Sequence, residues 1–134
     1  MTPIVVDTSA FMSILLGEPD AERFDQALFD HRADASVTAA NLLEARLIVE
    51  ARNPETGTYD LQALLDVYDI AVEPVTRELI DVAFRGWKRF GKGRHAAALN
   101  YGDCFSYALA KQRSVPLLFK GNDFTQTDIA SVLD

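Results

Sequence analysis

Four acidic side chains stand where they could act together on one substrate. Each follows an apolar run or lies near the start of an expected helix; the four are Asp7, Glu44, Asp103 and Asp123. Carboxylates gathered in one pocket repel each other unless protons or cations neutralise them. Oxygen ligands suit Mg²⁺ and Mn²⁺. The pattern therefore predicts an enzyme that uses one of these ions and acts on phosphates.

Apolar runs that alternate with helical patterns provide the frame for these acids. The expected strands are residues 3–6, 35–38, 70–73 and 117–119. The expected helices are residues 10–16, 20–30, 39–52, 60–68, 76–90 and 102–112, with a short helix after residue 124 and an edge strand at 130–133. Such alternation predicts a parallel sheet with helices on both faces. Ligands collect beyond the carboxyl ends of these strands, at the edge that the four acids would share.

The composition is typical of one soluble domain, residues 1–134, with 49% hydrophobic and 25% charged residues. The single cysteine excludes an internal disulfide, and two histidines add too few ligands for an ordinary structural zinc site. No apolar run approaches the roughly 20 residues that span a bilayer, and the first residues lack a basic leader. We expect a cytoplasmic protein without membrane contact.

The net charge of −7 argues by itself against a nucleic-acid partner, because phosphates attract basic surfaces. Metal ions would offset part of that charge, and one stretch is strongly basic. Its cations have helical spacing and are Arg85, Lys88, Arg89 and Lys92. This strip could follow RNA phosphates or could be a solvated helix face, and the sequence favours neither. Trp87 lies among apolar residues of the same expected helix, and we expect it in the core.

Each of the four acids also has a structural interpretation. Asp7, Asp103 and Asp123 could cap helices or complement their dipoles. Glu44 could be a charge on a helix surface. Such roles can coexist with ion binding, and the gathering of all four acids at one edge of the sheet is harder to explain by capping alone.

Three stretches of the chain carry a family resemblance. Residues 4–10 read IVVDTSA, residues 99–110 read LNYGDCFSYALA, and residues 116–124 read PLLFKGNDF. With Glu44 between the first two, the order and spacing resemble those of PIN-domain nucleases. Over essentially the whole chain the sequence is similar to the VapC toxins of bacterial VapBC toxin–antitoxin pairs.

This resemblance implies a three-layer α/β/α PIN-like fold around a central parallel sheet of four or five strands. It implies a Mg²⁺- or Mn²⁺-dependent endoribonuclease whose catalytic and metal-binding acids are Asp7, Glu44, Asp103 and Asp123. Asp7 and Asp103 would bind the main ion, while Glu44 and Asp123 would bind a second ion or position water. The hydroxyl of Thr8 would bond a carboxylate or a phosphate.

The implied partners are an RNA substrate, a cognate VapB-like antitoxin and a second copy of the chain in a homodimer. We expect an amphipathic antitoxin helix to pack on Phe11–Leu15 and Phe24–Leu28, with a basic side chain reaching the acids. Packing of these residues in the core is the equal alternative.

Two other classes of function remain open on the residues alone. A phosphoryl-transfer domain, either a response-regulator receiver or a haloacid-dehalogenase-type phosphatase, needs a second acid near the first strand. Ser9 stands two residues after Asp7, which counts against both types. A non-catalytic interaction module would use the acids only as caps, and metal binding with RNA cleavage would distinguish it from a nuclease.

Overall fold

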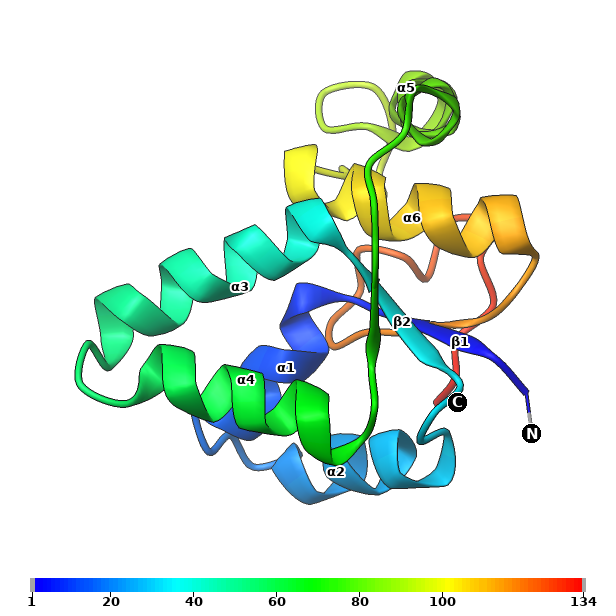
Figure 1. Ribbon diagram of the computed structural model, residues 1–134. Coiled ribbons are helices and arrows are strands. Elements are labelled where there is room, and N and C mark those ends of the chain that lie inside the picture. The colour runs from blue at the N-terminus through cyan, green and yellow to red at the C-terminus, as the bar shows by residue number, and fades with distance from the viewer. Residues whose placement is uncertain (1, 134) are drawn as a thin grey trace.

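A parallel four-stranded sheet lies at the centre of the computed structural model, which describes residues 2–133 (Figure 1). Its strands are β1 (Ile4–Val6), β2 (Ala35–Thr38), β3 (Ala71–Glu73) and β4 (Leu117–Leu118). The spatial order is β3-β2-β1-β4, and β1 pairs in parallel with both β2 and β4. The chain therefore runs outward from β1 to β3 and returns to the other side of β1. In such sheets the carboxyl ends of the strands at this reversal form a ligand-binding crevice.

Six helices within residues 2–133 complete the fold. They are α1 (Thr8–Leu15), α2 (Ala21–Asp30), α3 (Ala39–Arg52), α4 (Gly57–Val67), α5 (Arg77–Phe90) and α6 (Tyr101–Arg113). Figure 1 shows α1, α2 and α4 on one side of the sheet and α6 with α5 on the other, while α3 projects from the end of β2. The predicted three-layer α/β/α architecture is confirmed. No helix in the described part of the chain is long and apolar enough to cross a membrane.

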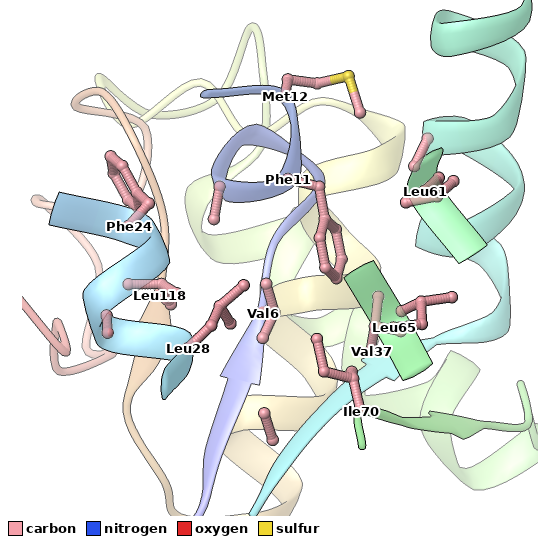
Figure 2. Packing of buried hydrophobic residues seen from close by; sticks show 14 of the residues in the cluster. Val6, Phe11, Met12, Phe24, Leu28, Val37, Leu61, Leu65, Ile70 and Leu118 are labelled. Carbon is pink, nitrogen blue, oxygen red and sulfur yellow. The ribbon is translucent and has the colours of Figure 1, made fainter. Parts of the chain in front are cut away.

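Each face of the sheet has its own hydrophobic core, because side chains alternate along a strand. Ile4 and Val6 belong to the core beneath α1, α2 and α4, where Figure 2 shows Val6, whereas Val5 belongs to the core beneath α5 and α6. All three side chains are buried. A strand covered on both faces explains the unbroken apolar run before Asp7.

The first core contains the residues that we expected to form an antitoxin groove, so that expectation is wrong. Phe11, Phe24 and Leu28 are at most 3% exposed, and Leu15 is half-buried against the same cluster. Figure 2 shows Phe11 directed between α4 and the sheet, with Phe24 and Leu28 facing β1 from α2. Phe11, Phe24 and Leu28 pack α1 and α2 against the sheet, so their side chains are not available to a partner.

The α5 helix does not bury the apolar face that carries Trp87, which we expected in the core. Its buried residues are Leu79, Ala83, Gly86 and Phe90. Ile80 and Phe84 are at least half exposed and Trp87 is 36% exposed, so the prediction that Trp87 lies in the core is wrong. The reason lies at Gly86, whose missing side chain lets α5 approach the ring of Tyr107 on α6. The α5 helix therefore packs on α6 through the face that allows the closest approach, and its more hydrophobic face stays exposed.

This close approach predicts a stability effect for Gly86→Ala. A Cβ at this position would lie 2.6 Å from Cδ1 and Cε1 of Tyr107. The ring is buried, and its hydroxyl donates a 2.8 Å bond to Asp128, so it has little freedom to move. Alanine favours a helix by about 1 kcal/mol, but overpacking outweighs this, and we expect a net loss of about 1–2 kcal/mol. Urea unfolding measures the change, with Arg85→Ala as an exposed control on the same helix.

The tail after β4 differs from the prediction of a short helix and an edge strand. It forms turns, and Ser131 makes a single parallel bridge to Leu117 in place of a strand. The hydroxyl of Thr127 donates to the carbonyl of Phe124, and that of Thr125 donates to the carbonyl of Asn122. Local side-chain bonds of this kind compete with helix formation.

Candidate functional site

Asp7 lies at the carboxyl end of β1, where the strand order reverses. Its Oδ2 accepts bonds from both the backbone N and the Oγ of Ser9, so Asp7 also caps α1. Its Oδ1 accepts a 2.5 Å bond from Oγ of Ser106 on α6. Ser9 Oγ in turn accepts from the backbone N of Lys120, which follows β4. The ends of β1 and β4 and the helix α6 therefore fix this buried carboxylate together.

Asp103 lies in the first turn of α6 and also has a structural role. Its Oδ2 accepts a bond from the backbone N of Asn100, and Asn100 Oδ1 accepts one from the backbone N of Asp103. This reciprocal pair is a capping box, which satisfies two backbone donors at the helix start. The eight consecutive residues from Asp103 to Ala110 are all buried. The acid thus begins a long buried segment of α6.

Glu44 reaches the same region from α3. Its Oε1 accepts a 2.6 Å bond from the hydroxyl of Thr8 and lies 3.4 Å from Nδ2 of Asn41. Gly102 lies directly beneath the carboxylate, and a Cβ there would come within 2.9 Å of Cδ and Oε1 and closer still to Oε2. The absence of a side chain at Gly102 is therefore what lets Glu44 approach α6.

Asn41 connects the supports of these acids. Its Nδ2 donates a 3.0 Å bond to the carbonyl of Gly102. Its Oδ1 accepts from Thr38 at 2.6 Å and lies 3.1 Å from Oγ of Ser106. Asn41, Thr38 and Ser106 are each completely buried. A buried network in which every member is bonded fixes its geometry strongly.

Asp123 lies on the exposed segment after β4, between Gly121 and the buried Phe124. Gly121 has φ +95°, a conformation that favours glycine and turns the chain after the strand. The charge of Asp123 acts on Asp103. It is the only one of the four acids with an exposed position.

The electrostatics link the four acids into one cluster. Burial raises the pKa of Asp103 to about 7; the bond from Asn100 opposes this shift, and the negative charges of Asp7 and Asp123 add to it. Burial also raises the pKa of Asp7, against the bonds from Ser106 and Ser9, and the charge of Glu44 adds to that rise. The charges of Asp7, Glu44 and Asp123 thus each raise the pKa of a neighbouring acid, and Asp7 and Asp103 hold protons more tightly than free carboxylates do.

The donor set suits a hard divalent cation, because it consists of carboxylate oxygens. In residues 2–133, however, no three His, Cys, Asp or Glu side chains stand close enough to be a ready-made set of metal ligands. The residues fit an ion by their chemistry.

The cations of the basic strip are exposed along α5 and the loop after it. Arg89 pairs with Asp128 at 3.5 Å, and Lys88 Nζ lies 5.7 Å from the ring centre of Phe84. Arg85 and Lys92 are also exposed, and they line different surface pockets. The structure gives these residues partly structural contacts and leaves both interpretations of the strip open.

Sequence reasoning missed Asn41, Gly102 and Ser106, although spacing offered a signal for two of them. Asn41 precedes Glu44 by three residues and Ser106 follows Asp103 by three, so each shares a helix face with an acid. Gly102 gave no such signal, because its role depends on the approach of another helix.

The contact under Glu44 predicts the effect of Gly102→Ala. The new methyl group would displace the Glu44 carboxylate and break its bonds to Thr8 and Asn41. Loss of a supporting contact at a metal site commonly lowers activity or metal affinity by about 10–100-fold. We expect cleavage to fall by about tenfold, with a melting temperature close to that of wild type. An unchanged cleavage rate would mean that the position of Glu44 is not critical.

Comparison with known proteins identifies the family that the sequence motifs resemble. The model of the PIN domain family matches residues 4–130. Ribonuclease VapC of Mycolicibacterium smegmatis is 45% identical over 129 residues, which are 96% of this chain and 99% of that protein. Ribonuclease VapC30 of Mycobacterium tuberculosis is 47% identical over 130 residues, which are 96% of this chain and 98% of that protein.

Solved structures agree on the fold. The Mycobacterium tuberculosis toxin VapC20 superposes with a TM-score of 0.79 at 18% identity, covering 96% of this chain and 98% of that chain. FitAcB from Neisseria gonorrhoeae gives a TM-score of 0.67 at 22% identity, covering 96% and 95%. The PIN domain model matches nearly the whole chain, and the named ribonucleases are 45–47% identical to it over 96% of its length. The chain therefore belongs to the PIN-domain family and, within it, to the VapC ribonucleases.

Proposed function

We propose that the chain is a Mg²⁺- or Mn²⁺-dependent endoribonuclease that hydrolyses RNA phosphodiester bonds in the cytoplasm as the toxin of a toxin–antitoxin pair. The observation that carries this proposal is the acidic cluster at the strand reversal, in which buried Asp7 and Asp103 both have raised pKa values. The membership of the VapC ribonucleases supports it. Burial is the main cause of these raised pKa values, and a divalent ion bound by both carboxylates would compensate for the lost hydration of their charges and for the repulsion between neighbours.

We assign a role to each of the four acids. Asp7 and Asp103 would hold the main ion, while Glu44 and Asp123 would hold a second ion or orient water. A bound ion of this kind supplies an activated water nucleophile and stabilises the leaving oxygen. Thr8 keeps Glu44 in place through its 2.6 Å bond.

The direct test is a cleavage assay on purified protein with fluorescent RNA. We expect cleavage in Mn²⁺ or Mg²⁺, none in EDTA, and recovery when the ion is restored. RNA cleavage that persists in EDTA after dialysis would overturn the metal dependence. Absence of cleavage in either ion, by protein that binds the ion, would favour a non-catalytic interaction module.

The proposed antitoxin would approach the acids with a basic side chain, since the exposed Asp123 and half-buried Glu44 offer it partners. Co-expression should yield a soluble complex with suppressed cleavage. The docking surface must lie outside Phe11, Phe24 and Leu28, because those side chains are core.

The basic strip is tested by salt dependence. Arg85→Gln with Lys92→Gln removes two exposed cations of the basic strip. If both follow RNA phosphates, the slope of log affinity against log salt should flatten by about 1.4, since each phosphate contact on a single strand contributes about 0.7. The matched control is Arg46→Gln with Arg52→Gln, which removes two exposed cations on α3. Equal slopes for both pairs would assign the strip to a solvated face.

We also propose that two copies of the chain form a homodimer.

A further inference from the structure

Lys120 lies two residues after β4, where the supports of two site acids meet. Its backbone N donates a 3.0 Å bond to Oγ of Ser9, and that hydroxyl donates a 2.7 Å bond to Oδ2 of Asp7. Three residues further along the chain is Asp123, whose charge acts on Asp103. Lys120 therefore stands in the chain between the support of Asp7 and the exposed acid Asp123.

The side chain of Lys120 binds the connection between α1 and α2. Its Nζ donates bonds to Oε1 of Glu18 at 2.9 Å and to Oδ1 of Asp20 at 3.2 Å. Asp20 Oδ1 also accepts a 2.5 Å bond from the hydroxyl of Ser13, which is completely buried on α1. One lysine thus joins two acids of a distant segment, and a buried side chain fixes one of them. We name Lys120, Glu18 and Asp20 the Lys120 clamp.

The loop that carries Asp123 begins at this clamp. The rings of Phe119 and Phe124 are buried, and their centres lie 5.1 Å apart, so they anchor the two ends of the loop. Residues 121–123 between them are exposed, and Gly121 adds backbone freedom. Ordering such a segment costs conformational entropy. The bonds of Lys120 constrain the loop on the side from which it leaves β4.

We propose that the Lys120 clamp positions Asp123 beside Asp103 for ion binding, so that Lys120 is a positioning residue of the nuclease site. This inference rests on the proposed metal-dependent function and extends the site to the α1–α2 connection. A loop that is already held in its bound arrangement loses less entropy when a ligand binds. The clamp should therefore raise the affinity for the ion without contacting it.

Mn²⁺ titration of the purified full chain without RNA gives the first test, with free Mn²⁺ followed by electron paramagnetic resonance. Lys120→Met keeps an unbranched side chain and removes its charge, and it should weaken Mn²⁺ binding about tenfold. The matched control Lys111→Met removes a lysine that pairs with Asp128 at 2.7 Å, and it should bind Mn²⁺ like wild type. Unchanged affinity in a folded Lys120→Met variant, checked by circular dichroism, would overturn the proposal.

Removal of the acidic partners separates positioning from simple charge. Glu18→Gln with Asp20→Asn removes the ion pairs, while asparagine at position 20 keeps an oxygen for the bond from Ser13. A positioning role predicts that this double variant and Lys120→Met both weaken Mn²⁺ binding. A purely electrostatic role predicts opposite signs, because loss of a cation favours the incoming ion and loss of two anions disfavours it. Opposite signs would overturn the proposal, and the double variant stays informative if Lys120→Met fails to fold.

Combination with Asp123→Asn tests whether the clamp acts through Asp123. If it does, Lys120→Met should change Mn²⁺ affinity by about twofold or less once Asp123 has been neutralised, because two changes in one pathway are not additive. An equal loss in both backgrounds would mean that Lys120 acts on another acid of the cluster, and it would overturn the assignment to Asp123.

Hydrogen exchange in EDTA tests the clamp without metal. The amides of residues 120 and 125 donate to Oγ of Ser9 and to the carbonyl of Asn122. Both should exchange faster in Lys120→Met and at the wild-type rate in Lys111→Met, because local opening governs exchange. Equal exchange in all three proteins would overturn the proposal.

The Mn²⁺ titration distinguishes this inference from the proposed function. A wild-type protein that binds no Mn²⁺ would overturn both. Wild-type binding with the same affinity in the clamp variants would overturn the inference alone and leave the metal-dependent nuclease intact.

Discussion

Exchange of Asp103 for Asn should abolish RNA cleavage while leaving the metal-free protein at least as stable as wild type. Asparagine keeps the shape and an oxygen that can accept the bond from Asn100. It removes one charge from a cluster in which Asp7 and Asp123 both oppose ionisation of Asp103. Wild type should gain melting temperature in Mn²⁺, because a ligand of the folded state stabilises it. The variant should lose most of this gain.

The matched control is Asp60→Asn on α4, which changes an exposed acid outside the cluster. It should keep both the cleavage and the metal-induced gain. Retention of both by Asp103→Asn would refute the catalytic role. A variant that unfolds without metal would show instead that Asp103 serves mainly as a helix cap.

The metal-free protein should lose stability as the pH rises from about 4 to 7. The pKa of Asp103 is raised from 3.8 to about 7, and that of Asp7 is also raised. The folded state therefore holds protons that the unfolded chain releases. Since stability falls with pH wherever the folded state binds more protons, Asp103 alone should account for a loss on the order of 3 kcal/mol.

Urea unfolding in EDTA at pH 4.5 and pH 7.5 measures this loss. The comparison with Asp103→Asn isolates the group, because general repulsion among the other acids is nearly common to both proteins. The variant should lose less stability than wild type over the interval and should be the more stable protein at pH 7.5. Equal pH dependence of the two proteins would show that Asp103 ionises normally.

Local sequence signals predicted the frame of the molecule well. Apolar runs placed the four central strands, and alternation with helices gave a parallel sheet. Parallel strands share a carboxyl edge, which is why Asp7 could be assigned to the site before any contact was known. The capping interpretations of Asp7 and Asp103 also proved correct: both acids cap helices, and both lie in the acidic cluster.

Local sequence signals did not predict the contacts between distant segments. The face that α5 buries depends on the ring of Tyr107 filling the space above Gly86. Nothing local distinguishes Phe11 and Phe24, which are core, from Phe84, which is exposed. The support network around Asn41 joins residues more than 60 positions apart. Hydrophobic periodicity reports which residues avoid water, but not which helix lies opposite.

The bonds to Asp7 restrict its denticity as a ligand. Both lone pairs of Oδ2 are engaged by Ser9, and one lone pair of Oδ1 is engaged by Ser106. A single lone pair remains, so an ion at this carboxylate would be bound in monodentate fashion. Monodentate oxygens suit the compact octahedral shell of Mg²⁺, whereas Ca²⁺ commonly takes bidentate carboxylates in a larger shell. The hydroxyls of Ser9 and Ser106, together with the backbone N–H of Ser9, would thereby favour Mg²⁺ over Ca²⁺ at this carboxylate.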